Sequence, residues 1–249
     1  MRLTFVGCTA GIALMACFSQ LAALAGPVRR QTSGPVGVGA LPPKVPGVHV
    51  LFSGDPEQVT ANFRNFGAPG PASWTVSNGA MIAANGNIVT RLKLTDFQLH
   101  LEWKEPYMPN AHGQERGNSG IGLDERYEIQ VLDSYGIASP GSGDCGSVYG
   151  QSAPLINACK PPRVWQSYDI IFRAPRWDAN GKKTQDARVT VFQNGMIVQN
   201  NTRIQGTTGI GRGSEGNSPG GIILQYHGNP MSFRNIWVVS LPLSGAAHY

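Results

Sequence analysis

The chain has 249 residues; 41% are hydrophobic, only 14% carry a charge, and the formal net charge at pH 7 is +5. This excess of positive charge is small, and no Lys/Arg run is interleaved with aromatic residues, which argues against nucleic acid as a partner. Glycine and proline make up about a fifth of the residues. Long helical periodicity is absent, so the composition favours an all-β protein built from short strands.

Residues 1–25 have the features of a signal peptide. Arg2 supplies a positive start, an apolar run follows, and residues 23–25 (Ala-Leu-Ala) form a cleavage site of the A-x-A type. Two alternatives remain open: lipidation of Cys17, or retention of the apolar run as a membrane anchor. Each of the three predicts export, to the periplasm or the extracellular medium.

Residues 26–47 are rich in proline and glycine and predict a flexible spacer, residues 48–241 a folded domain, and residues 242–249 a tail. Short alternating runs separated by turn residues predict about a dozen strands. They cover residues 48–52, 74–76, 80–82, 87–91, 97–103, 120–123, 127–132, 167–173, 188–193, 196–199, 221–227 and 233–241. Many short strands with almost no helix predict a two-sheet antiparallel jelly-roll sandwich.

Two cysteines would remain after removal of the signal peptide. Cys145 and Cys159 both lie in the loop-rich segment 133–163. An even pair in an oxidising compartment predicts a disulfide that closes this segment.

Polar side chains share one face of the predicted strand 127–132. Its apolar residues alternate with Glu128 and Gln130, so these two face the same way. Asp133 would face away in a regular strand, whereas one β-bulge near residues 131–132 would return it to the side of Glu128. Two carboxyl groups would suit acid/base or nucleophilic work on a glycoside. Alternatively, Asp133 caps the turn that follows.

The segment 222–227 repeats this arrangement with Gln225 and His227 on one face. An imidazole suits proton transfer or metal binding near neutral pH, although a histidine at a strand edge can also be purely structural. The two segments each offer a carboxyl or imidazole group beside a carboxamide. Together they predict the floor of a cleft that fits a sugar.

Further candidates for contacting a substrate come from the segments between strands. Asn118 lies in a Gly-flanked turn, Lys160 is held between Cys159 and two prolines, and Tyr149 and Trp165 could stack on sugar rings. The alternatives are an ordinary turn, an exposed lysine and core packing. Residues 211–216 match G-x-G-x-x-G but open no helix, so they predict a mobile loop and not a dinucleotide site.

The order of these segments resembles the 3-keto-disaccharide hydrolase domain family. The resemblance spans about residues 48–241, and its strongest blocks are YEIQVLDS at 127–134 and QYHGNPMSFRNIW at 225–237. It implies a sandwich like that of the concanavalin A-like lectins and glucanases. The chain departs from the family pattern in residues 55–66 and in the Gly-rich segment 206–221, which leaves substrate preference open.

The resemblance also implies a reaction on a carbohydrate. A ketone at C3 of a glucosyl unit acidifies the C2 proton, so a base can remove it, expel the C1 leaving group and let water add. Glu128 and His227 would share the proton transfer, and Lys160, Arg234 or a divalent cation would stabilise the enolate. Glu128, Asp133 and His227 would be acceptable ligands for such a cation.

Two other functions remain compatible with this sequence. One is a non-catalytic, lectin-like carbohydrate-binding module on the same sandwich, because a fold does not fix a function. The other is an endo-β-glucanase, since E-x-Q-x-x-D copies the spacing of the laminarinase motif E-x-D-x-x-E. Gln130 and Asp133 stand in place of that motif's central Asp and second Glu.

Overall fold

The computed structural model describes residues 42–44 and 46–243. The predicted signal peptide with Cys17, most of the predicted spacer and most of the predicted tail lie outside the described residues. Within the described ranges, no helix has both the length and the apolar character needed to span a bilayer.

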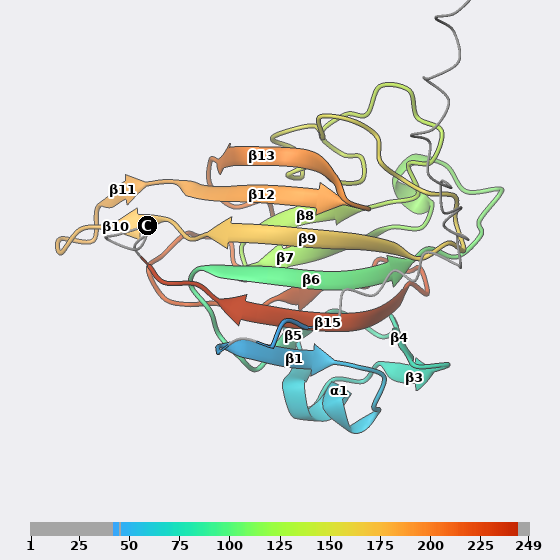
Figure 1. Ribbon diagram of the computed structural model, residues 1–249, viewed down its shortest axis with the longest axis horizontal. Coiled ribbons are helices and arrows are strands. Elements are labelled where there is room, and N and C mark those ends of the chain that lie inside the picture. Colours follow the sequence, from blue (N-terminus) through green and yellow to red (C-terminus); the bar gives the residue numbers. More distant parts are fainter. Residues whose placement is uncertain (1–41, 45, 244–249) are drawn as a thin grey trace, which may run out of the picture. The chain divides into compact units, whose positions relative to one another are not determined.

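The larger of the two sheets of the sandwich contains eight antiparallel strands in the order β13-β12-β9-β6-β15-β4-β3, with β1 also paired to β15. Figure 1 shows most of these strands side by side in one layer. Their bounds are β1 Val48–Phe52, β3 Thr75–Ser77, β4 Ala80–Ile82, β6 Phe97–Lys104, β9 Gln166–Arg173, β12 Ala187–Gln193, β13 Met196–Ile204 and β15 Ser232–Ser240.

A five-stranded sheet forms the second layer, in the order β2-β5-β14-β7-β8. Its strands are β2 Phe63–Asn65, β5 Ile88–Thr90, β7 Ser119–Leu123, β8 Tyr127–Val131 and β14 Ile223–Leu224. The remaining elements are the helix α1 Glu57–Asn62, the 3-10 turn η1 Gly113–Glu115, and a two-stranded ribbon of β10 Arg176–Trp177 and β11 Lys183–Gln185. The predicted all-β antiparallel sandwich is thus confirmed.

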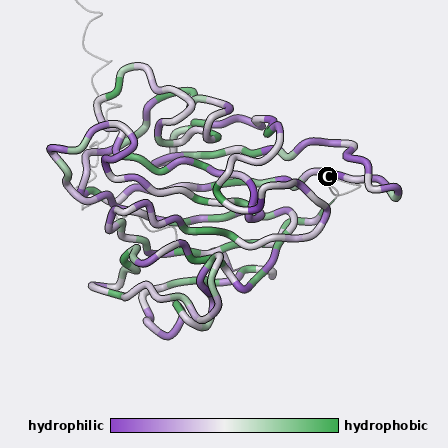
Figure 2. The backbone as a smooth tube through the Cα atoms, turned by 180° about the vertical axis from the view of Figure 1, so that it is seen from behind, coloured by the Kyte–Doolittle hydropathy of each residue, from purple (hydrophilic) through white to green (hydrophobic). Residues whose placement is uncertain are grey.

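The core lies between the two sheets and fixes which way β8 faces. Hydrophobic and hydrophilic residues alternate along many of the strands (Figure 2). On β8 the apolar residues Tyr127, Ile129 and Val131 are fully buried, and the Tyr127 ring lies 5.7 Å from the Phe172 ring of β9. Because side chains alternate along a strand, Glu128 and Gln130 must point away from this core. They therefore lie on the outer face of the five-stranded sheet.

Several segments differ from the sequence prediction. The strand predicted at residues 196–199 runs from Met196 to Ile204 as β13, and the ribbon of β10 and β11 was not predicted. The predicted strand 221–227 is regular only at Ile223–Leu224. Beyond it the backbone N–H of Gln225 still donates to Gly120 O at 3.0 Å, but that of Tyr226 donates to Asn87 Oδ1. Residues 55–66 contain α1 and β2, and a helix of six residues is too short to leave a periodic pattern.

The two cysteines are free thiols in the structure, in contrast to the predicted disulfide. The side-chain amide of Gln193 lies 3.5 Å from Cys145 Sγ and 3.2 Å from Cys159 Sγ. The sequence prediction that Cys145 and Cys159 lie near each other agrees with their shared contact with Gln193. An even cysteine count does not, however, specify the Cβ geometry that a disulfide requires.

Candidate active site

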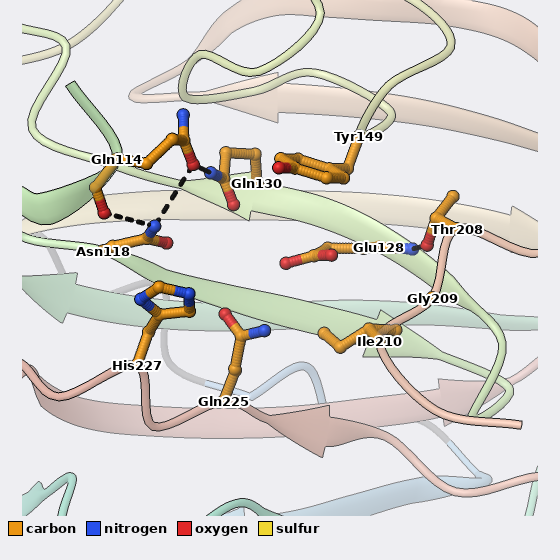
Figure 3. Close-up of a pocket in the computed structure, with 10 residues that line it drawn as sticks. All are labelled: Gln114, Asn118, Glu128, Gln130, Tyr149, Thr208, Gly209, Ile210, Gln225 and His227. Carbon is orange, nitrogen blue, oxygen red and sulfur yellow. Dashed lines mark hydrogen bonds between the residues drawn. The ribbon is translucent and has the colours of Figure 1, made fainter.

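A pocket of about 210 Å³ opens on the outer face of the five-stranded sheet (Figure 3). Carboxamides dominate its lining. The lining residues are Gln114, Asn118, Glu128, Gln130, Tyr149, Thr208, Gly209, Ile210, Gln225 and His227. Six of these were predicted: Asn118, Glu128, Gln130, Tyr149, Gln225 and His227.

Glu128 is the one carboxylic acid among the residues that line this pocket. Its backbone is held on both sides, by an N–H donated to Thr208 Oγ1 at 2.7 Å and by the N–H of Tyr149, which donates to its carbonyl at 3.1 Å. The residue is only 5% exposed. This burial raises the pKa of the carboxyl group to about 7, so Glu128 can give or take a proton near neutral pH.

The Glu128 carboxyl group lies directly over Gly120 of β7. A Cβ atom on Gly120 would come within 2.1 Å of Glu128 Oε1 and within 2.9 Å of its Cδ. Any larger residue would therefore displace the carboxyl group. Gly120 thus sets the position of Glu128, a role that the sequence did not reveal because the Asn-Ser-Gly segment also resembles an ordinary turn.

Gln225 and His227 face Glu128 across the pocket (Figure 3). The hydrogen bond from Gln225 N–H to Gly120 O, together with one of 2.7 Å from Ser119 Oγ to Gln225 O, anchors this segment beside β7. His227 is exposed at the edge of the pocket. An acid of raised pKa and an imidazole thus share one hollow, as the sequence predicts.

Two carboxamide oxygens in the pocket are buried and have no hydrogen-bond donor among the described residues, namely Gln130 Oε1 and Gln225 Oε1. The Gln130 amide group is fixed because its Nε2 donates to Gln114 Oε1 at 2.9 Å. Asn118 Nδ2 likewise donates to Gln114 O at 2.7 Å. An unsatisfied buried acceptor is costly. A ligand that brings several hydroxyl donors, such as a sugar, would satisfy both oxygens.

The segment 206–221 forms one wall of the pocket and is tied down. Arg126 donates to Ser214 O at 3.1 Å and to Ser218 O at 3.3 Å, and Tyr127 Oη donates to Glu215 Oε1 at 2.8 Å. The sequence predicts a mobile loop for residues 211–216, and its mobility stays a prediction. In the structure these long-range contacts, which glycine content does not encode, hold the loop against the sheet.

Asp133 does not reach the pocket. β8 ends at Val131, and the Asp133 carboxylate lies 3.3 Å from Arg116 Nε in a second cavity. The structure has the alternative arrangement and not the bulge: Asp133 caps the turn that follows, since the Tyr135 N–H donates to Asp133 Oδ1 at 3.3 Å. Backbone contact with Arg116 takes the chain away instead, with Asp133 N–H donating to Arg116 O at 3.2 Å.

Lys160, Trp165 and Arg234 also lie outside the pocket, and Lys160 and Arg234 both contact Trp165. Arg234 forms an ion pair of 2.7 Å with Glu102, and its guanidinium lies 4.0 Å from the centre of the Trp165 ring. Lys160 Nζ donates to Trp165 O at 3.3 Å. The predicted roles of these three residues in substrate binding are thus not supported by their placement.

Metal ligands do not assemble around Glu128. Across residues 42–44 and 46–243, no three His, Cys, Asp or Glu side chains come together as a metal-binding group. Glu128 and His227 share the pocket, but Asp133, the third expected ligand, is in the other cavity. The donor set does not fit the divalent cation that the family resemblance suggested.

Comparison with known proteins supports a carbohydrate-active enzyme. A crystal structure of a candidate glycosyl hydrolase from Parabacteroides distasonis is 41% identical, with a TM-score of 0.71, over 79% of this chain and 84% of that one. A second candidate glycosyl hydrolase from the same organism is 21% identical, with a TM-score of 0.57 over 79% and 94% of the two chains, and shows the shared fold. Among curated proteins, none is similar enough to match.

The family described as the 3-keto-alpha-glucoside-1,2-lyase-like domain matches residues 48–239. The match covers most of the chain and includes both strand segments that carry Glu128 and His227. It is the family that the sequence blocks at 127–134 and 225–237 predict. The chain therefore belongs to the family of 3-keto-disaccharide hydrolase, or 3-keto-alpha-glucoside-1,2-lyase-like, domains.

Proposed function

We propose that this carbohydrate-active enzyme domain cleaves 3-keto-α-glucosides by elimination across C1 and C2, followed by addition of water. The observation that carries the proposal is the composition of the pocket. Its lining has a single carboxylic acid of raised pKa, Glu128, opposite an imidazole, His227, with carboxamides between them. The family match supports the same chemistry.

A conventional glycosidase needs a different arrangement. Retaining and inverting enzymes place two carboxyl groups on either side of the glycosidic bond, about 5 to 10 Å apart. Asp133, the second carboxylate of the E-x-Q-x-x-D spacing, lines another cavity and pairs with Arg116. An endo-β-glucanase mechanism would therefore lack its second carboxyl group in the pocket of Glu128.

The proposed reaction begins with proton transfer. The Glu128 carboxylate removes the proton from C2, and the C3 ketone takes up the electron pair as an enolate. The enolate then expels the oxygen at C1, and His227 donates a proton to this leaving alcohol. In the second half water adds to the C1–C2 double bond: hydroxide goes to C1, its proton returns to His227, and Glu128 gives its proton back to C2.

Burial suits Glu128 to the role of the base. A carboxylate with a conjugate acid of pKa about 7 accepts a carbon-bound proton more readily than an exposed one would. His227 is at the exposed edge, where it can exchange protons with solvent between the two half-reactions. Enolate stabilisation would fall to the neutral donors of the pocket, the side-chain amides and hydroxyls, since Lys160 and Arg234 are elsewhere.

The direct test uses methyl 3-keto-α-glucopyranoside and unoxidised methyl α-glucopyranoside, with release of methanol as the measurement. We expect turnover of the ketone alone, and no change when a chelator is added. Turnover of the unoxidised glucoside at a similar rate would contradict the elimination chemistry. Loss of activity with chelator would show that a cation, held by other ligands, carries part of the reaction.

A lectin-like module is the second candidate, because the two unsatisfied carboxamide oxygens would bind hydroxyls without any catalysis. Glu128→Gln separates the two functions. An enzyme should keep its affinity for the 3-keto-glucoside and lose turnover by at least about 10²-fold. The exposed Glu57→Gln variant on α1 is the matched control and should behave as wild type. Sugar binding by wild type without any turnover would favour the lectin.

A further inference from the structure

Gln114 joins the carboxamides at one end of the pocket into a hydrogen-bonded chain (Figure 3). It lies in η1, shortly before β7, whereas Gln130 lies on β8. The Oε1 atom of Gln114 accepts from Gln130 Nε2 at 2.9 Å and from Asn118 Nδ2 at 3.1 Å. Its Nε2 donates to Gly143 O at 2.8 Å. The proposed reaction gives Gln114 no role.

Backbone carbonyl groups determine the direction of each hydrogen bond in this chain. A carboxamide can turn by half a rotation so that its oxygen and nitrogen exchange places, and its partners decide between the two orientations. A carbonyl oxygen can only accept. Gly143 O therefore requires the side-chain nitrogen of Gln114. In the same way Gln114 O requires the nitrogen of Asn118, which donates to it at 2.7 Å.

The orientation of Gln114 fixes that of Gln130. Because Gln114 Nε2 faces Gly143, its Oε1 faces Gln130, which can meet this acceptor only with its own nitrogen. Gln130 Nε2 also donates to Gly143 O at 3.3 Å, and this second acceptor requires the same orientation. The oxygen of Gln130 is thereby left to the pocket, where it is buried and has no donor among the described residues.

This point of the pocket can accept a hydrogen bond but cannot donate one. A hydroxyl group would satisfy the Gln130 oxygen. A ketone oxygen or a fluorine atom in the same place would leave it unsatisfied and be repelled by it. The C3 ketone of the proposed substrate therefore cannot face Gln130.

The proposed reaction leads to the same orientation of the sugar by a separate argument. C2 faces Glu128 and C1 faces His227. The ring then continues through O5 and C5 to C6 on the His227 side, and to C3 on the Glu128 side. Figure 3 shows Gln114 and Asn118 at the end of the pocket next to His227, and Thr208 at the end next to Glu128. The C6 hydroxyl thus lies toward the carboxamides, and the ketone lies toward the opposite end.

We propose that Gln114 is a positioning residue that fixes Gln130 as the acceptor for the C6 hydroxyl of the bound glucosyl ring. The inference rests on the proposed function for the placement of the ring. It narrows the substrates to hexosides with a free hydroxyl at C6. Xylosides, which lack C6, would leave Gln130 Oε1 unsatisfied and bind more weakly.

The test measures equilibrium binding, which does not depend on turnover. The ligands are methyl α-glucopyranoside and its 3-deoxy-3-fluoro and 6-deoxy-6-fluoro analogues, none of which has the ketone that the proposed reaction requires. NMR titration gives Kd for each. In wild type the 6-fluoro analogue should bind at least roughly tenfold more weakly than the parent, because fluorine cannot donate to Gln130 Oε1. The 3-fluoro analogue should stay within about threefold of the parent.

Two substitutions of Gln114 separate its orienting role from a merely structural one. Gln114→Glu keeps an acceptor for Gln130 Nε2 and should keep the weaker binding of the 6-fluoro analogue. Gln114→Lys offers only donors, so the Gln130 amide should turn its oxygen toward the new ammonium group and its nitrogen into the pocket. Kd for the 6-fluoro analogue should then fall to within about threefold of that for the parent. Gln185→Lys on β11 adds the same charge at an exposed position outside the pocket and should match wild type.

Three results would overturn the inference. The first is equal affinity of wild type for the parent and the 6-fluoro analogue, or no binding of the parent. The second is a larger loss for the 3-fluoro analogue than for the 6-fluoro analogue. The third is the same ratio of the two Kd values in Gln114→Glu and Gln114→Lys. If wild type turns over no 3-keto-glucoside but shows the expected binding pattern, the proposed reaction fails while the role of Gln114 stands.

Discussion

The protonation of the Glu128 carboxyl group changes near neutral pH. Its pKa is raised to about 7 by burial, so kcat/KM for a 3-keto-glucoside should rise with pH through about 7 as the carboxylate base forms. In the control Glu128→Gln this limb should vanish together with the activity. A flat profile in wild type between pH 5.5 and 8.5 would contradict the role of Glu128 as the base.

Glu128 should also lower the free energy of unfolding of the protein as the pH rises. The pKa of Glu128 is higher in the folded state than in the unfolded state. Its protonated form therefore makes its full contribution to the free energy of unfolding below about pH 4.5, and this contribution is lost as pH rises through about 7. Glu128→Gln removes this cost, so at pH 8 it should be more stable than wild type by up to roughly 3 kcal/mol. Denaturant unfolding at pH 5 and pH 8 measures the difference, which should shrink at the lower pH.

Gly120 determines the position of the Glu128 carboxyl group although it has no side chain of its own. Gly120→Ala would place Cβ within 2.1 Å of Glu128 Oε1 and should lower kcat by about 10²-fold, because small displacements of catalytic groups are costly. Gly213→Ala is the matched control, since nothing lies within 4 Å of a Cβ there. Equal activity of the two variants would show that the carboxyl group has room to shift.

At the scale of elements, the wall formed by segment 206–221 depends on its ties to β8. Tyr127→Phe keeps the ring packed on Phe172 but removes the hydrogen bond to Glu215, which also pairs with Lys183 at 2.5 Å. We expect a loss of about 1 to 3 kcal/mol in stability and faster amide hydrogen exchange in residues 206–221. Exchange in β12 and β13 serves as the internal control, and equal acceleration there would mean global loosening.

Sequence patterns predict structure best where a strand has one buried face. Glu128 and Gln130 are placed correctly by the pattern, because the alternation of side chains leaves one choice of face once the apolar residues are buried. Gln225 and His227 also reach the pocket, but they lie beyond the end of β14, where the bond from Gln225 N–H to Gly120 O positions the segment. Asp133 is not placed correctly, since the strand ends before it. Gln114 and Thr208 left no signal at all, because loop residues follow no period and reach the pocket only through tertiary contacts.

For the whole molecule, the open prediction concerns localisation. We propose that the chain is exported, on the basis of the A-x-A site at residues 23–25. N-terminal sequencing of the protein from a fractionated native host should then begin at Gly26, in the periplasmic or extracellular fraction. A lipid-modified Cys17 would identify the alternative, and an intact chain in the cytosol would rule out export.

The raised pKa of Glu128 also has a calorimetric consequence. A neutral keto-sugar that fills the pocket displaces water from the carboxyl group, which favours its protonated form still further. Near pH 7 the complex should therefore take up a fraction of a proton from the buffer. The apparent heat of binding by the inactive His227→Ala variant should differ between phosphate and Tris in proportion to their ionisation enthalpies, and this difference should disappear once Glu128 is also replaced by glutamine.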